Sequence, residues 1–313
     1  MNLVVLEPLG IPQDRLASMV REAVDGRMEV VLCDTRAEDV PTLIERSKEA
    51  DAVVLSNFPY RREVMEHCPN LSFIDVAFTG VDHVDLPYCR ERGITVSNCA
   101  GYSTAAVADL TFGLVLGLAR NLSACDSAVR AGGTKAGLVG FELEGKKFGV
   151  VGLGAIGSRV AAIAGAFGCE VYSYNRSHKD LPGVKQVDLD TLLAQCDIVS
   201  LHVPATAETK HLIDAGRIAR MKPGALLINT ARGSVVDARA LADALNEERI
   251  AGAGIDVFEM EPPVPRDHPL LTAKHVLATP HVAFATAQSM EKRAAIVCDN
   301  LRAWLAGSPI HTV

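Results

Sequence analysis

The sequence contains 313 residues, of which 49% are hydrophobic and 22% are charged. This composition is typical of a globular protein, and the length predicts about two domains. The formal net charge is −7, so neither a nucleic acid nor an anionic membrane is expected as a partner.

The start of the chain does not read as a targeting signal. Residues 3–6 are apolar, but no basic n-region precedes them, and Glu7 and Pro8 follow at once. The apolar stretch 105–119 contains Asp109 and is shorter than the ~20 residues that a membrane span needs. The eight cysteines are scattered without metal-ligand spacing, which is typical of reduced thiols. We therefore expect a cytoplasmic protein without a metal site.

The first third of the chain alternates short β-type runs with helical patterns. Such alternation predicts βαβ units and a parallel sheet, here without a glycine-rich motif. Strands are predicted over residues 3–6, 29–32, 52–55, 72–76 and 94–96, with helices over 15–24, 42–49, 61–67 and 87–92.

The middle of the chain differs from both flanks. Residues 103–120 are apolar on nearly all faces of a helix, with Ser103 as a plausible N-cap, so this helix must be buried on most sides. We interpret it as the crossover between two domains. Residues 123–145 are glycine-rich and predict a loop-and-helix excursion over the surface or into a partner.

The α/β alternation resumes at residue 147 and continues to the end of the chain. The fold class predicted is therefore α/β, with two doubly wound parallel-sheet, Rossmann-like domains and a cleft between them. Strands are predicted over 148–151, 170–174, 198–201, 225–228, 250–255 and 276–278, and helices over 158–167, 189–195, 214–221, 238–247 and 286–305.

One motif carries a specific chemical meaning. The apolar run 148–151 leads into Gly152-x-Gly154-x-x-Gly157, and a helical pattern follows. In this context the glycines allow a tight turn, close approach of the backbone to a pyrophosphate and close packing of helix on strand. The free N–H groups at the helix start, including those of Ala155 and Ile156, then face the phosphates. The motif predicts a dinucleotide site.

The end of the second strand of this unit predicts which dinucleotide binds. An acidic residue at that position bonds the ribose 2′-hydroxyl of NAD. Here the chain carries Asn175, Arg176 and Ser177 instead. Arg176 can bind a 2′-phosphate that a carboxylate would repel, so NADP(H) is favoured and NAD(H) remains possible. The alternative interpretation is an ordinary solvated turn.

Three polar side chains follow predicted strands of the same sheet. Arg232, Glu261 and His281 stand just beyond the carboxyl ends of strands, which is the edge where open parallel sheets bind ligands. Each alone has a plain explanation: a surface ion pair, a loop acid before prolines, one of nine histidines. Their shared position favours a catalytic group.

At these residues the chain resembles the D-2-hydroxyacid dehydrogenase family, including its glyoxylate and hydroxypyruvate reductases. The resemblance covers nearly the whole chain: the glycine loop, residues 229–233, 256–258 with Glu261, and 279–281. It implies a substrate domain of flavodoxin type from residues 1–99 with 286–313, an NAD(P)-binding domain from 100–285, and a homodimer.

The resemblance also implies a reaction, which is reversible hydride transfer between a nicotinamide and a small 2-keto acid. Arg232 would hold the substrate, His281 would exchange a proton with its oxygen, and Glu261 would orient His281. Asp256 would bond the nicotinamide carboxamide.

Further positions match the family. Asn57, Thr79 and Gly80 would contact the substrate together with Arg232 and His281, although a turn-forming role for Asn57 is equally plausible. The expected cofactor contacts are Thr104, Gly152, Gly154, Ala155, Ile156, Gly157, Asn175, Arg176, Ser177, Val203, Pro204, Thr230, Ala231 and Asp256.

The chain also departs from the family. Ala155 replaces a common arginine, and Phe284 adds bulk where small residues are frequent. Two alternatives stay open: a phosphite or formate-type dehydrogenase of the same fold, although Glu261 argues against formate, and a non-catalytic nucleotide-sensing corepressor. Which 2-keto acid is reduced does not follow from these residues.

Overall fold

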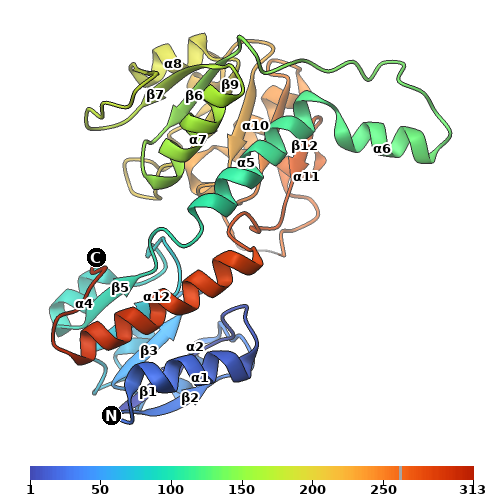
Figure 1. Ribbon diagram of the computed structural model, residues 1–313. Coiled ribbons are helices and arrows are strands. Elements are labelled where there is room, and N and C mark those ends of the chain that lie inside the picture. Colours follow the sequence, from blue (N-terminus) through green and yellow to red (C-terminus); the bar gives the residue numbers. More distant parts are fainter. Residues whose placement is uncertain (261–262) are drawn as a thin grey trace. The chain divides into compact units, whose positions relative to one another are not determined.

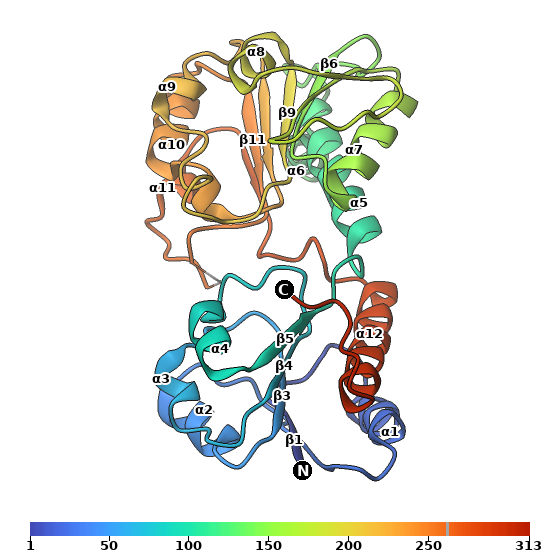
Figure 2. The same ribbon diagram turned by 90° about the vertical axis from the view of Figure 1, so that its left-hand side faces the viewer.

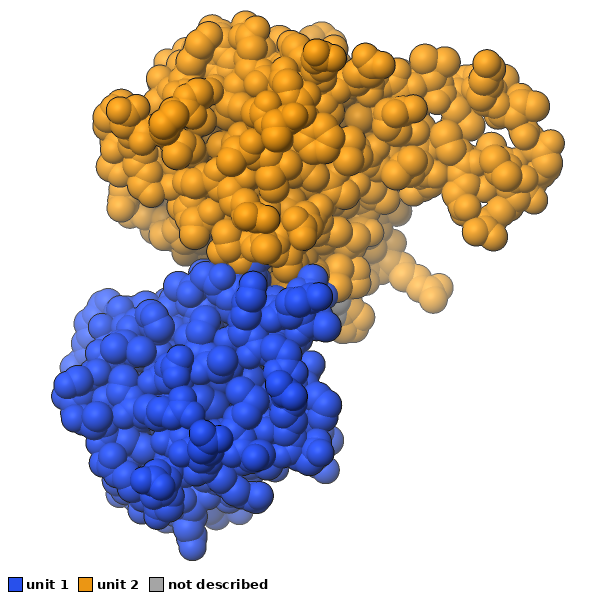
Figure 3. Space-filling view, viewed as in Figure 1, with its two compact units in different colours: residues 1–103, 285–313 blue, residues 104–284 orange. Residues whose placement is uncertain are grey.

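The computed structural model of the protein describes residues 1–260 and 263–313. The chain divides into two compact units, one made of residues 1–103 and 285–313 and the other of residues 104–284 (Figure 3). Each unit is built around one parallel β-sheet flanked by helices. The predicted fold class of two doubly wound α/β units is therefore confirmed.

The sheet of the first unit has five strands in the order β2-β1-β3-β4-β5, and all neighbours are parallel. The strand order reverses between β1 and β3, and ligands bind at such a switch point, outside the carboxyl ends of the strands. All residues of β3 and β4 are buried, which explains the continuous apolar sequence of β3 and leaves Asp75 of β4 as a buried acid. The strands are β1 (Asn2–Val5), β2 (Glu29–Leu32), β3 (Ala52–Leu55), β4 (Phe73–Val76) and β5 (Thr95–Asn98).

Helices cover both faces of this sheet. The first and last helices of the chain lie side by side on one face, and three shorter helices cover the other (Figures 1 and 2). An ion pair of 2.9 Å between Arg15 and Glu291 joins the first and last helices. The helices are α1 (Gln13–Val24) and α12 (Ala287–Leu305) on one face and α2 (Val40–Ser47), α3 (Arg62–Met65) and α4 (Leu86–Arg92) on the other.

The sheet of the second unit has seven strands in the order β12-β11-β10-β9-β6-β7-β8, again all parallel. Its order reverses between β6 and β9, the arrangement of a dinucleotide-binding sheet. The glycine loop follows β6 and therefore lies at this switch point. The strands are β6 (Lys147–Val151), β7 (Glu170–Tyr174), β8 (Val184–Gln186), β9 (Ile198–Leu201), β10 (Leu226–Asn229), β11 (Gly252–Ile255) and β12 (Val276–Ala278).

Two apolar clusters hold helices to the two faces of this sheet. One cluster joins α5 and α7 to the sheet, and the other joins α8, α9, α10 and α11 to the opposite face (Figure 2). The helices are α5 (Thr104–Ala119), α7 (Ala155–Ala166), α8 (Leu189–Gln195), α9 (Ala215–Ile218), α10 (Ala238–Asn246) and α11 (Pro269–Thr272).

The predicted excursion after α5 is an arm that extends from the second unit. It contains α6 (Leu122–Arg130), which has no buried residue (Figure 1). Its base is closed, because the Asn121 side chain donates to the carbonyls of Leu138 (3.5 Å) and Val139 (3.4 Å). Leu122, Val129 and Val139 are 55%, 74% and 89% exposed, so the arm presents apolar side chains outwards.

Among the described residues, no helix taken singly has the length and apolar character to cross a membrane; only the bent pair α5 and α6, taken together, meets those two criteria. The same residues hold no group of three or more metal-ligating side chains.

The structure adds three short elements that the sequence did not predict, namely β8, α11 and a 3-10 turn at Gly233–Val235. Each is three or four residues long, too short for a periodic pattern. Helix α7 also begins at Ala155 rather than at Ser158, because Gly154 is its N-cap and the glycine loop forms its first turn.

Candidate active site

At two of the three positions in the glycine loop, close packing leaves room only for glycine. Gly152 has φ +99°, and a Cβ on it would lie 2.6 Å from the carbonyl oxygen of His202. A Cβ on Gly157 would collide with the carbonyl of Gly152. Any side chain at these two positions would force the helix away from the strand.

Gly154 is different, because a Cβ on it would meet no heavy atom within 4 Å. Close packing within the chain therefore does not explain this glycine. It is the N-cap of α7 and makes no side-chain cap, so a helix start with its positive dipole end adjoins open space. This local geometry fits the pyrophosphate of a dinucleotide.

Asn175, at the end of β7, contacts the glycine loop directly. Its Oδ1 accepts a hydrogen bond from the Leu153 N–H (3.1 Å), and its Nδ2 donates to the Ser177 carbonyl (2.8 Å) and to the Ser177 Oγ (3.2 Å). An amide can make both kinds of bond at once, which a carboxylate cannot. Asn175 thus shapes the turn that carries Arg176.

Lys179 is a cation at this site that the sequence analysis did not single out. Its Nζ donates to the Leu153 carbonyl (2.6 Å), and its N–H donates to Gln186 Oε1 (3.0 Å). Arg176 is exposed beside it in the same turn. Arg176 also contributes to the lowered pKa of Glu208, after the larger effect of the hydrogen bond with Thr206. The turn after β7 therefore lies near the 206–208 loop after β9.

The segment after β9 packs against the glycine loop. Burial lowers the pKa of His202 to about 3, so this histidine is neutral at working pH, and its Nε2 lies 2.8 Å from Ser200 Oγ. The side chain of Val203 would lie 2.9 Å from a Cβ on Gly152, and the Pro204 carbonyl accepts from Thr209 Oγ1 (2.6 Å). The neutral His202 ring is thus held against Ser200 at the end of β9.

The turn after β10 carries Arg232. The Asn229 side chain closes this turn by donating to the Arg232 carbonyl (2.9 Å) and accepting from the Ala231 N–H (3.1 Å). Thr230 is buried, and its Oγ1 lies 3.1 Å from Thr111 Oγ1 on α5. Thr104, the first residue of that helix, is half-buried.

Gly233 brings the Arg232 turn against the next strand end. A Cβ on Gly233 would collide with the backbone of Phe258 and Glu259. The Arg232 side chain is half-buried, and its Nη1 donates to the Ala231 carbonyl (2.9 Å). Only glycine lets the turns after β10 and β11 touch here.

Asp256 holds the loop that carries His281. Its side chain is fully buried, and its Oδ1 accepts from Thr279 Oγ1 (2.6 Å) and from the Val282 N–H (2.9 Å). Its Oδ2 accepts from the Ala283 N–H (2.9 Å). Three donors from one loop converge on this buried carboxyl group and fix the loop firmly. A contact between Asp256 and the nicotinamide stays a prediction.

His281 itself has a left-handed backbone, with φ +53°. Its N–H donates to the Asp256 carbonyl (2.7 Å), and its ring meets the Phe284 ring edge to face at 5.4 Å. A non-glycine residue in this conformation needs support from its surroundings, and such residues cluster at functional sites. The Asp256 loop provides that support.

Glu261, the predicted partner of His281, lies outside the described residues. Close to it in sequence, Glu259 Oε2 lies 3.2 Å from Nε2 of the buried His268, whose ring stands edge-on to Phe258. The Nδ1 of His268 accepts from the Leu270 N–H (3.3 Å), so this pair serves the start of α11. The sequence contained no signal for it.

In the first unit, the predicted loop at Thr79 and Gly80 follows β4. The Phe78 carbonyl accepts from the Cys99 N–H (3.0 Å), and the Thr79 carbonyl accepts from the Asn98 side chain (2.8 Å). Across a trans peptide the N–H points opposite to the C=O. The N–H groups of Thr79 and Gly80 are therefore directed away from Asn98 and Cys99.

Asn57 lies at the carboxyl edge of the same sheet and bonds Arg36, which the sequence analysis did not single out. Its Oδ1 accepts from Arg36 Nη1 (2.8 Å), which also donates to Glu7 Oε2 (3.0 Å). Glu7 is buried, and its Oε1 accepts from the Ser56 N–H (2.8 Å). Residues 49 positions apart make that contact, so sequence spacing does not reveal it.

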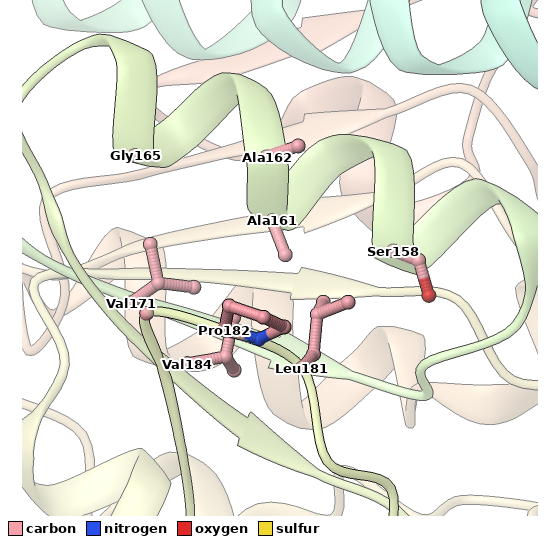
Figure 4. A pocket seen from close by; sticks show the side chains of 9 residues that line it. Ser158, Ala161, Ala162, Gly165, Val171, Leu181, Pro182 and Val184 are labelled. Atoms are coloured by element: carbon pink, nitrogen blue, oxygen red, sulfur yellow. The ribbon is translucent and has the colours of Figure 1, made fainter.

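A separate apolar pocket of ≈ 190 Å³ lies between α7 and the segment before β8 (Figure 4). Ala161 and Ala162 line it from the helix, and Leu181 and Pro182 line it from the segment. None of the predicted site residues lines it. Its lining has no charged side chain and only one polar side chain, that of Ser158.

Comparison with known proteins agrees with this geometry. Residues 112–283 match the family described as D-isomer specific 2-hydroxyacid dehydrogenase, NAD binding domain. The chain belongs to the D-isomer-specific 2-hydroxyacid dehydrogenases. The family and the class of enzyme predicted from the sequence are thereby confirmed, as is a nicotinamide cofactor.

Among the relatives, a glyoxylate reductase of Thermofilum pendens is 40% identical over 95% of this chain and 90% of its own length. A hydroxypyruvate reductase of Blautia hydrogenotrophica is 34% identical over 91% of each chain. Among solved structures, an acyclic imino acid reductase (Bsp5) in complex with NADPH and D-Arg has a TM-score of 0.92, with 28% identity over the full length of both chains.

Proposed function

We propose that this protein reduces a small 2-keto acid to the D-2-hydroxy acid, with Arg232 and His281 as the groups that act on the substrate. Bound NADPH or NADH supplies a hydride to the carbonyl carbon. His281 donates a proton to the carbonyl oxygen as its π bond to carbon breaks, and Arg232 stabilises the charge that develops on that oxygen. Glu261 is proposed to orient His281.

The observation that carries this proposal is the linkage between three neighbouring strand ends. The Asp256 N–H donates to the Asn229 carbonyl (3.0 Å), and the His281 N–H donates to the Asp256 carbonyl (2.7 Å). The loops of Arg232 and His281 are thus both fastened to the segment after β11. A rigid scaffold of this kind suits a reaction that depends on positioning.

The substrate carboxylate is proposed to bind the N–H groups of Thr79 and Gly80 and the Arg232 guanidinium. The orientation of the Thr79 and Gly80 N–H groups supports the contact with these groups. The fixed turn after β10 supports the contact with Arg232. Asn57 is proposed as a further pocket residue, positioned by Arg36. Glyoxylate and hydroxypyruvate are the leading substrates, since the relatives include reductases named for both.

NADP(H) is the proposed cofactor. Arg176, Ser177 and Lys179 place two cations and a hydroxyl in one turn beside the glycine loop, where the adenosine ribose of a dinucleotide lies. A 2′-phosphate would find charge-assisted donors there. The remaining cofactor contacts are proposed to be those predicted from the sequence, including Thr104, Thr230, Ala231 and the segment Val203-Pro204.

A homodimer formed through the arm is part of the same proposal. The exposed apolar residues of the arm support it, because such patches mark protein interfaces. A cytoplasmic location is also proposed, and the finding that all eight cysteines are free supports it.

The test is a substrate panel with both reduced cofactors. Glyoxylate, hydroxypyruvate and phenylpyruvate are supplied with NADPH or NADH, and oxidation of the cofactor is followed by absorbance. Formate and phosphite are tested with the oxidised cofactors, and keto acids are repeated with ammonia because one structural neighbour is an imino acid reductase. We expect turnover of a 2-keto acid without ammonia, and a D-hydroxy acid as the product on chiral chromatography.

The His281→Ala variant sharpens this test. We expect its kcat to fall by about 10²–10⁴-fold while NADPH still binds, because a general acid is lost. His67→Ala, which changes an exposed histidine at the end of α3, is the matched control. An inactive wild type across the panel, or a His281→Ala variant with near-normal kcat, would refute the proposal.

A further inference from the structure

A buried arginine lies against the loop that is proposed to receive the substrate carboxylate. Arg293 belongs to α12 and is only 4% exposed. Its Nη2 donates to the Leu9 carbonyl (2.5 Å) and its Nη1 to the Ala77 carbonyl (3.4 Å). Burying a guanidinium costs free energy, so a buried arginine that bonds backbone calls for an explanation.

The two carbonyls that Arg293 bonds lie at the ligand edge of the sheet. Leu9 comes after β1 and Ala77 directly after β4. These segments are far apart in sequence, and the planar fork of a guanidinium can bond both at once. Arg293 thereby ties the start of the Phe78–Asp82 loop to the segment after β1.

Arg293 begins a series of fixed carbonyls in that loop. The Ala77 carbonyl bonds Arg293, the Phe78 carbonyl bonds the Cys99 N–H, and the Thr79 carbonyl bonds the Asn98 side chain. Three successive peptide groups are therefore held in orientation. The direction of the Thr79 and Gly80 N–H groups depends on this series.

Arg293 also contacts the ring of Tyr102, which packs against the first residue of the loop. Its guanidinium lies 5.9 Å from the centre of the Tyr102 ring, and the Tyr102 ring packs against the Phe78 ring at 6.1 Å. A Cβ on Gly10 (φ +79°) would lie 3.4 Å from Arg293 Nη2 and 2.7 Å from Met290 Sδ. The side chain is enclosed, so its position is well defined.

Arg293 is the most deeply buried cation at this edge of the sheet. Burial lowers the pKa of Arg293, and Glu7 is among the groups that raise it, so these two charges are within electrostatic reach. Glu7 is itself bonded by Arg36 at 3.0 Å. Arg36 is 34% exposed and also pairs with Glu38, whereas Arg293 is only 4% exposed, so water screens the charge of Arg293 least.

We propose that Arg293 is a positioning residue for substrate binding: it fixes the orientation of the Thr79 and Gly80 N–H groups and supplies a buried positive charge behind them. The inference rests on the proposed function, in which this loop binds the carboxylate of a 2-keto acid. Arg293 does not touch the substrate. It acts through the peptide groups that do, and through a field that water screens weakly.

The test separates binding of the anion from catalysis and from folding. In Arg293→Met we expect the KM for glyoxylate to rise about tenfold, as for a lost interaction with a charged group, with kcat changed by less than about twofold. The KM for NADPH should not change, and the inhibition constant of oxalate should rise in parallel. Arg293→Lys keeps the positive charge but loses the planar guanidinium that bonds two carbonyls. Its KM for glyoxylate should therefore lie between those of the wild type and Arg293→Met.

Arg302→Met is the matched control. Arg302 lies on the same helix, pairs with Asp299 at 2.9 Å and is 47% exposed, so the variant removes an equal charge far from the loop. Its kinetic constants should equal those of the wild type. A shift of the glyoxylate KM in Arg302→Met as large as that in Arg293→Met would overturn the proposal.

The outcomes distinguish this inference from the proposed function. A wild type that reduces no 2-keto acid removes the proposed function itself. An active wild type whose KM for glyoxylate is the same in Arg293→Met overturns the role of Arg293 alone. A common loss of kcat and of cofactor binding would show a merely structural role and also overturns it. If Arg293→Met does not fold, as judged by circular dichroism, the same criteria apply to Arg293→Lys and to Asn98→Ala, which removes the Thr79 carbonyl bond.

Discussion

Asn175 shows how one side chain can hold both the glycine loop and the turn that follows β7. Its amide bonds the glycine loop on one side and Ser177 on the other. A carboxylate at this position could accept the first bond but could not donate the second. The turn that results carries Arg176 and Lys179 on the side where a ribose would lie.

This arrangement predicts how the turn discriminates between cofactors. Arg176→Ala and Lys179→Met should each weaken binding of 2′-phospho-ADP-ribose about tenfold, since each removes a charge-assisted contact. Binding of ADP-ribose should change by less than about twofold. Isothermal titration calorimetry measures both without any substrate. Lys185→Met, which changes an exposed lysine on β8, is the control. Equal effects on the two ligands would remove the 2′-phosphate from the proposal.

His281 has a strained backbone conformation that neighbouring residues stabilise. Its φ of +53° is unusual for a non-glycine residue, and the Asp256 carboxylate holds the residues on both sides of it. The motif Thr279-Pro280-His281 does not predict this conformation. The sequence indicated Asp256 and His281 separately and did not indicate that one holds the loop of the other.

At the scale of elements, the most informative segment is the arm between α5 and β6. Helix α6 is amphipathic by sequence, yet none of its residues is buried in the chain. An isolated helix of nine residues is marginal in water, so its apolar side chains gain from a partner surface. At the base of the arm, the Asn121 side chain bonds the carbonyls of Leu138 and Val139.

This feature predicts the effect of charges on the arm. The double variant Val129→Glu with Val139→Glu should convert the proposed dimer to monomer, because burying two carboxylates in an apolar interface is costly. Size-exclusion chromatography with light scattering measures the mass. Val31→Glu places one charge on an exposed valine of the first unit and should leave the mass unchanged. A double variant with the mass of the wild type would exclude the arm as the interface.

At the scale of the whole molecule, both ends of the chain complete the first unit. The C-terminal segment pairs with β5, since the Asn98 N–H donates to the His311 carbonyl (3.0 Å) and the Val313 N–H to the Val96 carbonyl (3.1 Å). His311 Nδ1 lies 2.8 Å from Asn300 Oδ1, and Asn300 Nδ2 donates to Asp75 Oδ1 (2.8 Å). A series of hydrogen-bonded polar groups thus runs from the exposed His311 through the buried Asn300 to Asp75 on β4.

Asp75, the acid in this series of polar groups, predicts that the stability of the protein depends on pH. Burial raises the pKa of Asp75 well above its ordinary value, an effect that the Asn300 hydrogen bond opposes. The folded state therefore keeps a proton that the unfolded chain releases above about pH 4, and the free energy of unfolding decreases as pH rises. Asp75→Asn stays neutral, so its Tm should fall less than that of the wild type between about pH 5 and about pH 8.

Thermal unfolding followed by circular dichroism measures this difference. Asp126→Asn changes an exposed acid of the arm that pairs with Arg130, and its Tm should follow the wild type across the same range. Parallel Tm curves for the wild type and Asp75→Asn would show that Asp75 does not hold the proton.

The sequence by itself determined the alternation of strands and helices, the glycine loop and the strand ends that precede Arg232 and His281. Periodicity and turn residues act over a few positions, so most strands were predicted within a residue or two, whereas β8 and α11 were too short to show a pattern.

Only the tertiary structure decided which side chains meet. Asp256 reaches the His281 loop across 26 and 27 positions, and Arg293 reaches Ala77 across 216 and Leu9 across 284. Contacts of this kind depend on how strands are ordered in a sheet and on where the last helix returns. Local preferences of the chain do not encode these distances, because close packing of distant segments sets them.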